Sequence, residues 1–392
     1  MTVDSLVKKW VMPTLQSLEM ARDITRKQHY VPQFLLKNFS LKVKKHWKIN
    51  VFDTIRKDLR LNQSVDGNFY QNNFYDKDNS VESLLSEKIE NPASLVIQKI
   101  ISSQDLKILR NNVESQSVLL KFISTLLHRT PQARDKALSF IYSFFDSFTG
   151  ELLELNDFDR EKTSIPKIRY ENKDGFASFL ALQGVVDACI LVDLDFHLVK
   201  NNTSLDFWIS DHPAFSYNWF YKELEHPGVT GLPARGFQIF LPISTKLMIC
   251  LYDPGIYKYG SKKSQLSDIN DESDVIILNS LQALNSESIM GFQRSEECKL
   301  VQRLCEKYGN LKVQEYESQI ILREELSDEK IKSTHVTFGK QFKLSKMPSF
   351  VIIKKKVRQH SSSFSMRSPE LVALHQENRD EILKREKTVL EL

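Results

Sequence analysis

His29 is the first residue in this chain whose type and position could do chemistry. It stands directly before the proline-led apolar run VPQFLLKNF, and the whole chain has nine histidines. Pro32 suits the first position of a helix, so the run predicts a helix that begins beside His29. At such a helix end a neutral imidazole could act as an acid or base or bind phosphate, with Tyr30 and Gln33 as candidate substrate-binding residues. The alternative is that His29 only caps the helix.

A second group of chemically useful side chains lies in FWISDHPAF. The alternation before it predicts a strand that ends in Ser210, Asp211 and His212, so these side chains stand at the rim of a sheet. Asp211 beside His212 could orient or activate an imidazole for general acid–base catalysis. The alternative is a turn in which the Asp211 carboxylate accepts hydrogen bonds from backbone N–H groups.

A third group follows from a predicted hairpin. ACILVDLDFHLVK and SLDFWIS both alternate, and pairing them through NNT places their apolar residues on one face. The other face then carries Asp193, Asp195, His197 and Asp206, with Asp206 opposite His197. Such a set could hold Mg²⁺, Mn²⁺ or Zn²⁺, and Mg²⁺ or Mn²⁺ are the cofactors that we expect for oxygen-rich ligands. The alternative is a solvent-facing sheet surface.

Familiar catalytic signatures are absent, since the chain has no GxGxxG, GxxxxGK[ST], HExxH or GxSxG. His46, Lys48 and Asp53 spell HxKxxxxD, which resembles the phosphodiesterase motif of the phospholipase D family. That motif normally occurs twice and is followed by a Gly-Ser element, whereas here one copy precedes TIRKDLRLN. We therefore interpret this match as accidental.

The elements that must position these residues change along the chain. HWKINVFDT and DLRLNQS predict an antiparallel hairpin. From Ser80 the apolar residues recur at helical spacing, which predicts a helical layer over roughly 80–155, with Thr130 and Pro131 suited to the start of its last helix. The polar segment 156–175 predicts a connection, and beyond it strands dominate, with FQIFLPIS and KLMICLYD expected to pair.

Composition narrows the class of protein. With 392 residues, 41% of them hydrophobic, the chain can bury a sizeable core. The net charge of +4 is only mildly basic, which neither requires nor excludes nucleic acid as a partner. The four cysteines are far apart without a CxxC pair, and no segment approaches the ~20 apolar residues of a membrane span. We expect a cytoplasmic protein that is not bound to a membrane.

Several segments together resemble one family. They are QHYVPQFLLKNF, the hairpin ending in GNFY, VESLLSEKIE, LLHRTPQAR, FWISDHPAF and LPISTKLMICL. The family is the bacterial domain-of-unknown-function family four-two-three-eight, whose pattern is roughly HxVPxxxLxxF near the start and SDNPV later. The likeness spans about residues 22–295 in the same order.

The resemblance supplies candidate residues and no mechanism. It implies that His29, Arg129 and Asp211 belong to a site, with Arg129 in the family's Arg-Thr-Pro element. His212 stands where the family pattern has Asn. Asn279 and Gln282, in LNSLQALN, match the family's later Asn-containing helix and are candidates for substrate binding.

These observations predict an α+β fold with an N-terminal helix and β-hairpin, a central helical layer, and then a mainly antiparallel sheet. The expected division of the chain is an N-terminal lead, a core α+β domain, strands added to the core, and a flexible linker with a terminal helix: 1–24, 25–300, 301–360 and 361–392.

The functional hypothesis is an enzyme acting on a phosphodiester, of nuclease type, as an effector in bacterial defence or growth control. His29 would act as acid, base or phosphate ligand, Arg129 as an anion clamp, and Asp211 with His212 as an orienting or metal-binding pair. The alternative is a non-catalytic module that binds nucleic acid or protein and whose motif residues are structural.

Overall fold

The computed structural model describes residues 26–155, 173–260, 265–309, 311, 314–326 and 330–377. The predicted lead and nearly all of the predicted connection at 156–175 lie outside these residues. Within the described residues the fold is α+β with mostly antiparallel sheets, as predicted. One contiguous apolar core runs from Tyr30 to Val351 and unites the N-terminal elements, the helices and the second sheet.

The first sheet is built around β3 (His46–Asp53), whose buried residues Ile49 and Val51 enter the core. β3 pairs antiparallel with β2 (Leu41–Val43), β4 (Asp58–Ser64) and β13 (Ile289–Phe292), and β13 pairs with β7 (Ile209–Ser210). The predicted hairpin of β3 and β4 is therefore confirmed. Because β13 lies between β3 and β7, the end of β7 lies in the same sheet as the N-terminal strands.

His29 lies in a strand and not at a helix start. β1 (Lys27–His29) pairs with β5 (Tyr70–Asn72), which places His29 opposite Tyr70. The predicted helix exists as α3 (Gln33–Lys37), with Pro32 at its N-cap position. The prediction that His29 stands beside the first turn was wrong because backbone pairing with β5 extends the chain up to His29 before it turns into α3.

The predicted helical layer is confirmed. Its elements are α4 (Ser80–Leu84), the π-helix η2 (Leu85–Glu90), α5 (Asn91–Ser103), α6 (Val113–His128) and α7 (Pro131–Leu155). Beyond the predicted range, α8 (Lys173–Asp187) packs against α6. Thr130 starts α7 as expected, since its hydroxyl accepts a hydrogen bond from the N–H of Ala133 (3.2 Å). A Cβ added at Gly184 in α8 would lie 2.8 Å from the Cα of Thr125 in α6, so these two helices pack unusually closely.

The second sheet has the strand order β12, β6, β10, β9, β8. Their bounds are Leu266–Ile269, Asp195–Asn201, Leu247–Tyr252, Gln238–Pro242 and Phe215–Tyr217. The predicted pairing of β9 with β10 is confirmed. The predicted hairpin of the β6 segment with SLDFWIS is wrong, because β6 pairs with β10 and β12 and places His197 opposite Cys250.

The reason for that error is burial on both faces of β6. Phe196, His197, Leu198 and Val199 are all buried, so the strand is interior and has no solvent-facing side. The alternation in the sequence, on which the predicted hairpin was based, identifies only one of the two buried faces of β6. The segment that leads to β7 instead crosses to the first sheet.

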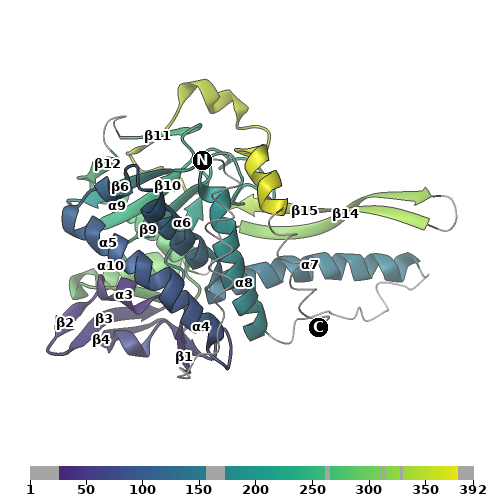
Figure 1. Ribbon diagram of the computed structural model, residues 1–392. Coiled ribbons are helices and arrows are strands. Elements are labelled where there is room, and N and C mark those ends of the chain that lie inside the picture. Colours follow the sequence, from purple (N-terminus) through teal and green to yellow (C-terminus); the bar gives the residue numbers. More distant parts are fainter. Residues whose placement is uncertain are drawn as a thin grey trace.

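The elements that follow the second sheet form several smaller units. They are β11 (Tyr257–Tyr259), α9 (Glu272–Asn285), α10 (Cys298–Tyr308), β14 (Gln314–Leu326), β15 (Lys330–Gln341) and β16 (Val351–Ile353). β14 and β15 form a two-stranded ribbon of their own, and β16 pairs with β11. Figure 1 shows the ribbon and the far part of α7 extending from the same side of the body, where α7 contacts β14.

The chain after residue 360 is fastened to the core. The guanidinium of Arg367 pairs with the carboxylate of Asp193 (3.0 Å) and donates to the backbone oxygen of Ile190 (2.7 Å). Residues 369–377 are helical, and His375 contacts Asp187 at the end of α8 (2.6 Å). The first part of the predicted flexible linker is therefore held by ion pairs, and residues 378–392 lie outside the described residues.

Candidate functional site

Arg129, at the junction of α6 and α7, joins the N-terminal motif to the helical layer. Its side chain is fully buried. Nε donates to the hydroxyl of Tyr75 (2.8 Å), Nη1 pairs with Glu90 (2.5 Å), and Nη2 donates to the backbone oxygen of His29 (2.6 Å). Because all three guanidinium nitrogens are bound to protein atoms, this geometry suits a positioning role better than the predicted anion clamp.

His29 lies beside this arginine, and one nitrogen of its ring has no hydrogen-bond partner. Its Nε2 is sealed from solvent and has no hydrogen-bond partner, while the ring interacts with the backbone oxygen of Lys27. That bond belongs to Nδ1, which leaves Nε2 of the neutral ring as an acceptor. Burial lowers the pKa of His29 to about 4, and Arg129 and Lys27 act in the same direction against Asp66. At neutral pH His29 is therefore an uncharged base.

Glu82, in α4, lies next to His29. Its carboxyl group accepts a hydrogen bond from the backbone N–H of His29, and its Oε2 is sealed from solvent without a partner. Burial raises the pKa of Glu82 to about 7; the charge of Arg129 opposes this shift and that of Glu90 adds to it. A carboxyl group with such a pKa is partly protonated at neutral pH and can donate a proton.

The π-helix η2 explains how Glu82 and Glu90 reach the same arginine. Glu82 precedes this helix and Glu90 is its last residue, and both act on Arg129, the latter as an ion pair. In a regular α-helix the two side chains would point about 80° apart, at about 100° per residue. A π-turn changes that angle, and such turns are frequent at functional sites.

The two neighbours of His29 that the sequence nominated behave differently. Tyr30 is buried, and its hydroxyl has no hydrogen-bond partner in the described part of the chain although it is not sealed from solvent. The charge of Asp211 acts on this hydroxyl, after burial, to raise the pKa of Tyr30, so the two residues are close. Gln33 is half-buried at the first position of α3, and its side chain makes no hydrogen bond among the described residues.

His212 is fixed by the residue that follows Arg129. Its Nδ1 lies 2.6 Å from the hydroxyl of Thr130, deep in the protein. Burial lowers the pKa of His212 to about 3, and the positive charges of Lys136 and His128 add to the effect. The structure thus brings the motifs around residues 29, 129 and 211 together, through the bond from Arg129 to His29 and the bond from Thr130 to His212.

Asp211 has a different environment from its neighbour. Its carboxylate accepts from the backbone N–H groups of Glu287, Ser288 and Ile289 (2.8, 2.6 and 2.9 Å) and from the hydroxyl of Ser288 (3.0 Å). Burial raises the pKa of Asp211, and these four donors oppose that shift. With both oxygens occupied, the carboxylate clamps the loop between α9 and β13. Its position is structural, but the donors lie in a distant loop and not in the local turn that was the predicted alternative.

Gln282 and Asn279, on α9, hold the backbone on either side of β7. The amide of Gln282 donates to the hydroxyl of Ser210 (2.5 Å) and to the backbone oxygen of His212 (2.9 Å), while its Oε1 is buried without a partner. Asn279 bonds the backbone at Asp206 and Trp208, two residues apart, with both ends of its amide. Asn279 therefore has a structural position, whereas Gln282 retains one bare acceptor.

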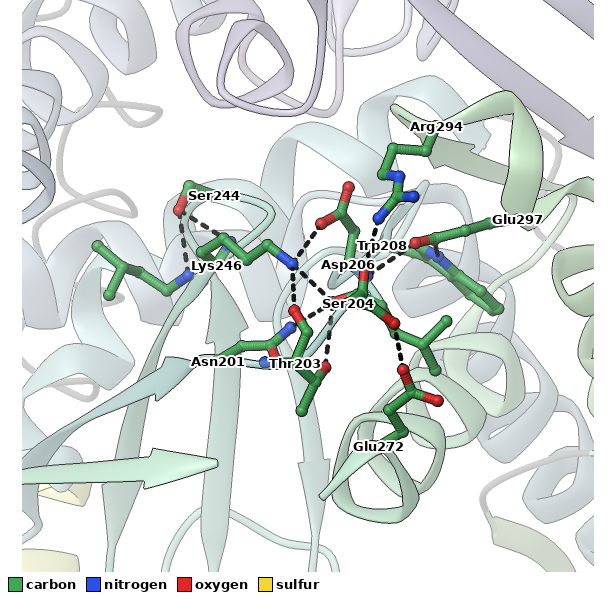
Figure 2. A network of polar contacts seen from close by, with 12 residues as sticks. Asn201, Thr203, Ser204, Asp206, Trp208, Ser244, Lys246, Glu272, Arg294 and Glu297 are labelled. Atoms are coloured by element: carbon green, nitrogen blue, oxygen red, sulfur yellow. Dashed lines mark hydrogen bonds and ion pairs between the residues drawn. The ribbon is translucent and has the colours of Figure 1, made fainter. Parts of the chain in front are cut away.

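The four candidate metal ligands do not meet. Asp193 pairs with Arg367, Asp195 bonds to Tyr252, and His197 contacts the hydroxyl of Ser267 (2.9 Å). Figure 2 shows Asp206 in another network, where Lys246 binds its carboxylate (2.8 Å) and Glu297 accepts its backbone N–H (2.9 Å). Among the described residues no group of three or more His, Cys, Asp or Glu side chains could hold a metal ion.

A buried ionic cluster that the sequence did not predict lies at the ends of α6 and α8. Nδ1 of His128 faces the backbone oxygen of Ser124 (2.8 Å), and its Nε2 faces the carboxylate of Asp187 (3.0 Å). Both partners are acceptors, so His128 carries hydrogen on both nitrogens and a positive charge. Burial would lower the pKa of His128, but Asp187 reverses this and raises it. The close approach at Gly184 brings these helix ends together.

The family assignment follows from a comparison with known families. A family model described as Protein of unknown function (DUF4238) matches residues 27–296. This is more than half of the 392-residue chain. The chain belongs to this family. The resemblance drawn from the sequence is thereby confirmed, and no similar curated protein and no similar solved structure was found.

The DUF4238 region contains every group of the candidate site, including Glu82, which the sequence did not nominate. The signal was present, because VESLLSEKIE is one of the segments that resemble the family and holds both Glu82 and Glu90. His128 likewise stands beside Arg129 in LLHRTPQAR. What the sequence could not show is which of these charged residues are buried.

The HxKxxxxD match does not form a site, in agreement with its interpretation as accidental. His46 and Asp53 stand at opposite ends of the eight-residue strand β3. Asp53 accepts from the backbone N–H groups of Ile55 and Arg56 in the turn that follows. Separately, within the described ranges, no helix has the length and apolar character needed to cross a membrane.

Proposed function

We propose that this DUF4238 protein is a phosphodiester-cleaving enzyme of nuclease type, in which His29 acts as general base and Glu82 as general acid. The observation that carries the proposal is a pair of buried atoms without hydrogen-bond partners, Nε2 of His29 and Oε2 of Glu82, in two residues that are linked through the backbone N–H of His29. Buried polar atoms without partners are rare and costly, so their retention at one place favours a functional role.

The protonation states fit the two roles. At a pH between about 4 and 7, His29 is neutral and Glu82 is protonated. Both atoms are enclosed in this structure, so the proposed step includes a local opening that admits substrate. His29 then removes a proton from an attacking water or ribose hydroxyl, whose oxygen forms a bond to phosphorus. The bond from phosphorus to the leaving oxygen breaks, and Glu82 donates its proton to that oxygen.

The remaining residues support this pair. Arg129 holds the backbone oxygen of His29 and balances Glu90, so it fixes the relative positions of β1 and η2. In this proposal Asp211 keeps the β7 rim in place and does not touch substrate. The step uses no metal ligand, so Mg²⁺ and Mn²⁺ are treated as variables of the assay.

The test is cleavage of RNA and of DNA by the purified full chain, with and without Mg²⁺ or Mn²⁺. We expect cleavage that falls about 100-fold or more in His29→Gln and in Glu82→Gln, the usual range for a lost acid or base. His197→Gln is the matched control, because His197 is also a buried histidine with its pKa lowered to about 4. No cleavage of either polymer at high enzyme concentration would overturn the proposal.

The pH dependence provides a second test. The rate should rise as pH increases through about 4, where His29 loses its proton, and fall as pH increases through about 7, where Glu82 loses its own. Glu82→Gln should remove the fall at high pH from whatever activity remains. A rate that keeps rising above pH 8 would contradict the assignment of Glu82 as the acid.

The wider expectations belong to the same proposal. We place the enzyme in the cytoplasm, where the four unpaired cysteines would remain reduced, and assign it to defence or growth control. Expression in bacterial culture tests the latter: the wild type should slow growth and His29→Gln should not. The competing function, a binding module without catalysis, is favoured by Asp211 and Asn279, whose side chains serve the backbone. It gains if nucleic acid binds and is never cleaved.

A further inference from the structure

His212 offers a hydrogen-bonding atom that the acid–base pair does not use. It is 5% exposed, and its Nδ1 is bonded to the hydroxyl of Thr130. Its Nε2 has no hydrogen-bond partner in the described part of the chain, yet it is not among the buried atoms sealed from solvent. One nitrogen of this buried ring is therefore without a partner and not fully sealed from solvent.

The neighbouring bonds determine what that nitrogen can do. The hydroxyl oxygen of Thr130 already accepts the N–H of Ala133, so its hydrogen is free to be donated to Nδ1 of His212. A neutral imidazole that accepts at Nδ1 carries its hydrogen on Nε2. His212 then presents a donor, the complement of His29, which presents an acceptor.

The charges around His212 are positive. Lys136 and His128 both act on it, and His128 is protonated because each of its nitrogens faces an acceptor. Two carboxylates also belong to this environment, and both are engaged: Asp187 pairs with His128 (3.0 Å), and Asp211 is bound by four donors in the loop at residues 287–289. A hydrogen-bond donor close to two cations, with the oxygens of the nearby carboxylates occupied by other donors, is suited to an anion.

Tyr30 links this place to the acid–base pair. It follows His29 directly, and its hydroxyl lies near Asp211, reaches solvent and has no hydrogen-bond partner in the described residues. A second hydrogen-bond donor therefore lies near Asp211, the residue that precedes His212.

We propose that His212 and Tyr30 line an anion pocket that takes a single phosphate group, with Lys136 and His128 supplying its positive potential. The inference rests on the proposed function for its biological meaning, because the phosphate would be part of the substrate. Its physical content is independent, since binding of inorganic phosphate requires no cleavage.

The test is titration of the full chain with inorganic phosphate, followed by calorimetry and by the imidazole NMR signals of His212. We expect saturable binding that shifts the His212 signals, and a loss of affinity of about tenfold or more in His212→Asn, the range for a hydrogen bond to a charged group. Tyr30→Phe and Lys136→Gln should each weaken binding several-fold. His197→Asn, which removes a buried histidine from the second sheet, should leave the affinity unchanged.

Two results would overturn the pocket: no saturable binding of phosphate by the wild type, or equal affinity in the wild type and a folded His212→Asn. If His212→Asn does not fold, the wild-type NMR shift and Lys136→Gln decide the question. His29→Gln separates the two proposals, because it should abolish cleavage while phosphate binding persists. If the wild type binds phosphate but cleaves neither polymer, the anion pocket is supported and the proposed nuclease activity is contradicted.

Discussion

Asp211 and the pair of His29 and Glu82 lie in the same region of the fold but differ in how their polar atoms are used. Asp211 has four donors on its two oxygens, three of them backbone N–H groups. His29 and Glu82 each keep one atom bare although both are enclosed. Polar residues in the segments that resemble the family are therefore of two kinds. Some stabilise the backbone through hydrogen bonds, and others keep an atom free of hydrogen bonds and available for a reaction.

The difference teaches how to separate the two kinds of residue in a family without a known activity. A satisfied buried carboxylate stabilises the fold, and removing it leaves backbone groups unpaired. An unsatisfied one costs stability, and it persists only where something other than folding requires it. Substitutions should thus change the free energy of unfolding in opposite directions in the two regions, and measurements on single variants can test this contrast.

The largest effect is expected at Asp211. Asp211→Ala removes the acceptor of three backbone N–H groups between residues 287 and 289, and the free energy of unfolding should fall by about 3–5 kcal/mol. Chemical denaturation measures this change. Asp58→Ala, at an exposed aspartate that pairs with Arg60, is the control and should change stability by no more than about 0.5 kcal/mol. A folded Asp211→Ala variant as stable as the wild type would contradict the stabilising role of the Asp211 carboxylate.

Arg129 comes next because it serves both regions. Arg129→Lys keeps the charge but cannot reach Tyr75, Glu90 and the backbone of His29 at once, so we expect a loss of roughly 2–4 kcal/mol in unfolding free energy. Activity should fall further than stability explains, since β1 and η2 are no longer held together. Unfolding curves and cleavage rates on the same preparation measure both, and an unchanged rate in folded protein would contradict the positioning role.

Glu82 is the residue at which a substitution should increase the free energy of unfolding. Its pKa rises from 4.5 in the unfolded chain to about 7 in the folded one, so the folded state holds the proton more tightly. The stability that this proton provides is fully present below pH 4.5 and is lost as pH rises through about 7, by up to roughly 3 kcal/mol. Glu82→Gln does not titrate, so its advantage over the wild type should grow across that range. Melting curves at several pH values measure it.

The matched control for this prediction is Glu90→Gln on the same helical segment. Glu90 is paired with the guanidinium of Arg129 at 2.5 Å, so its replacement should destabilise the protein at neutral pH. Opposite signs for Glu82→Gln and Glu90→Gln would support the division between reactive and architectural carboxylates. Equal signs would show that both carboxylates serve Arg129 alone.

Much of the fold could be predicted from the sequence because local patterns carry it. The hairpin of β3 and β4, the helical layer and the pairing of β9 with β10 follow from periodicity and turn residues. The pairing of β7 with β13 and of β1 with β5 could not be predicted, since it joins segments far apart in the chain. That pairing is what removed His29 from the helix start and separated Asp206 from His197.

The candidate site divides in the same way. His29, Arg129 and His212 could be nominated from motif segments, and they do lie in one connected set of bonds. Glu82 and His128 could not, because their importance depends on burial and on a π-turn that no residue pattern announced. The metal candidates failed for the converse reason, since an alternating pattern was taken to have a free face.

The smallest expected effect is at Thr130, which belongs to both regions at once. Its hydroxyl caps α7 through Ala133 and holds Nδ1 of His212. Thr130→Val removes both bonds with little change of shape, and it should cost about 1 kcal/mol through the cap and free the His212 ring to change tautomer. Thr130→Ser restores the hydroxyl and should recover both properties. If serine recovers stability but not the His212 NMR signal of the wild type, then the cap and the orientation of His212 are separate functions of Thr130.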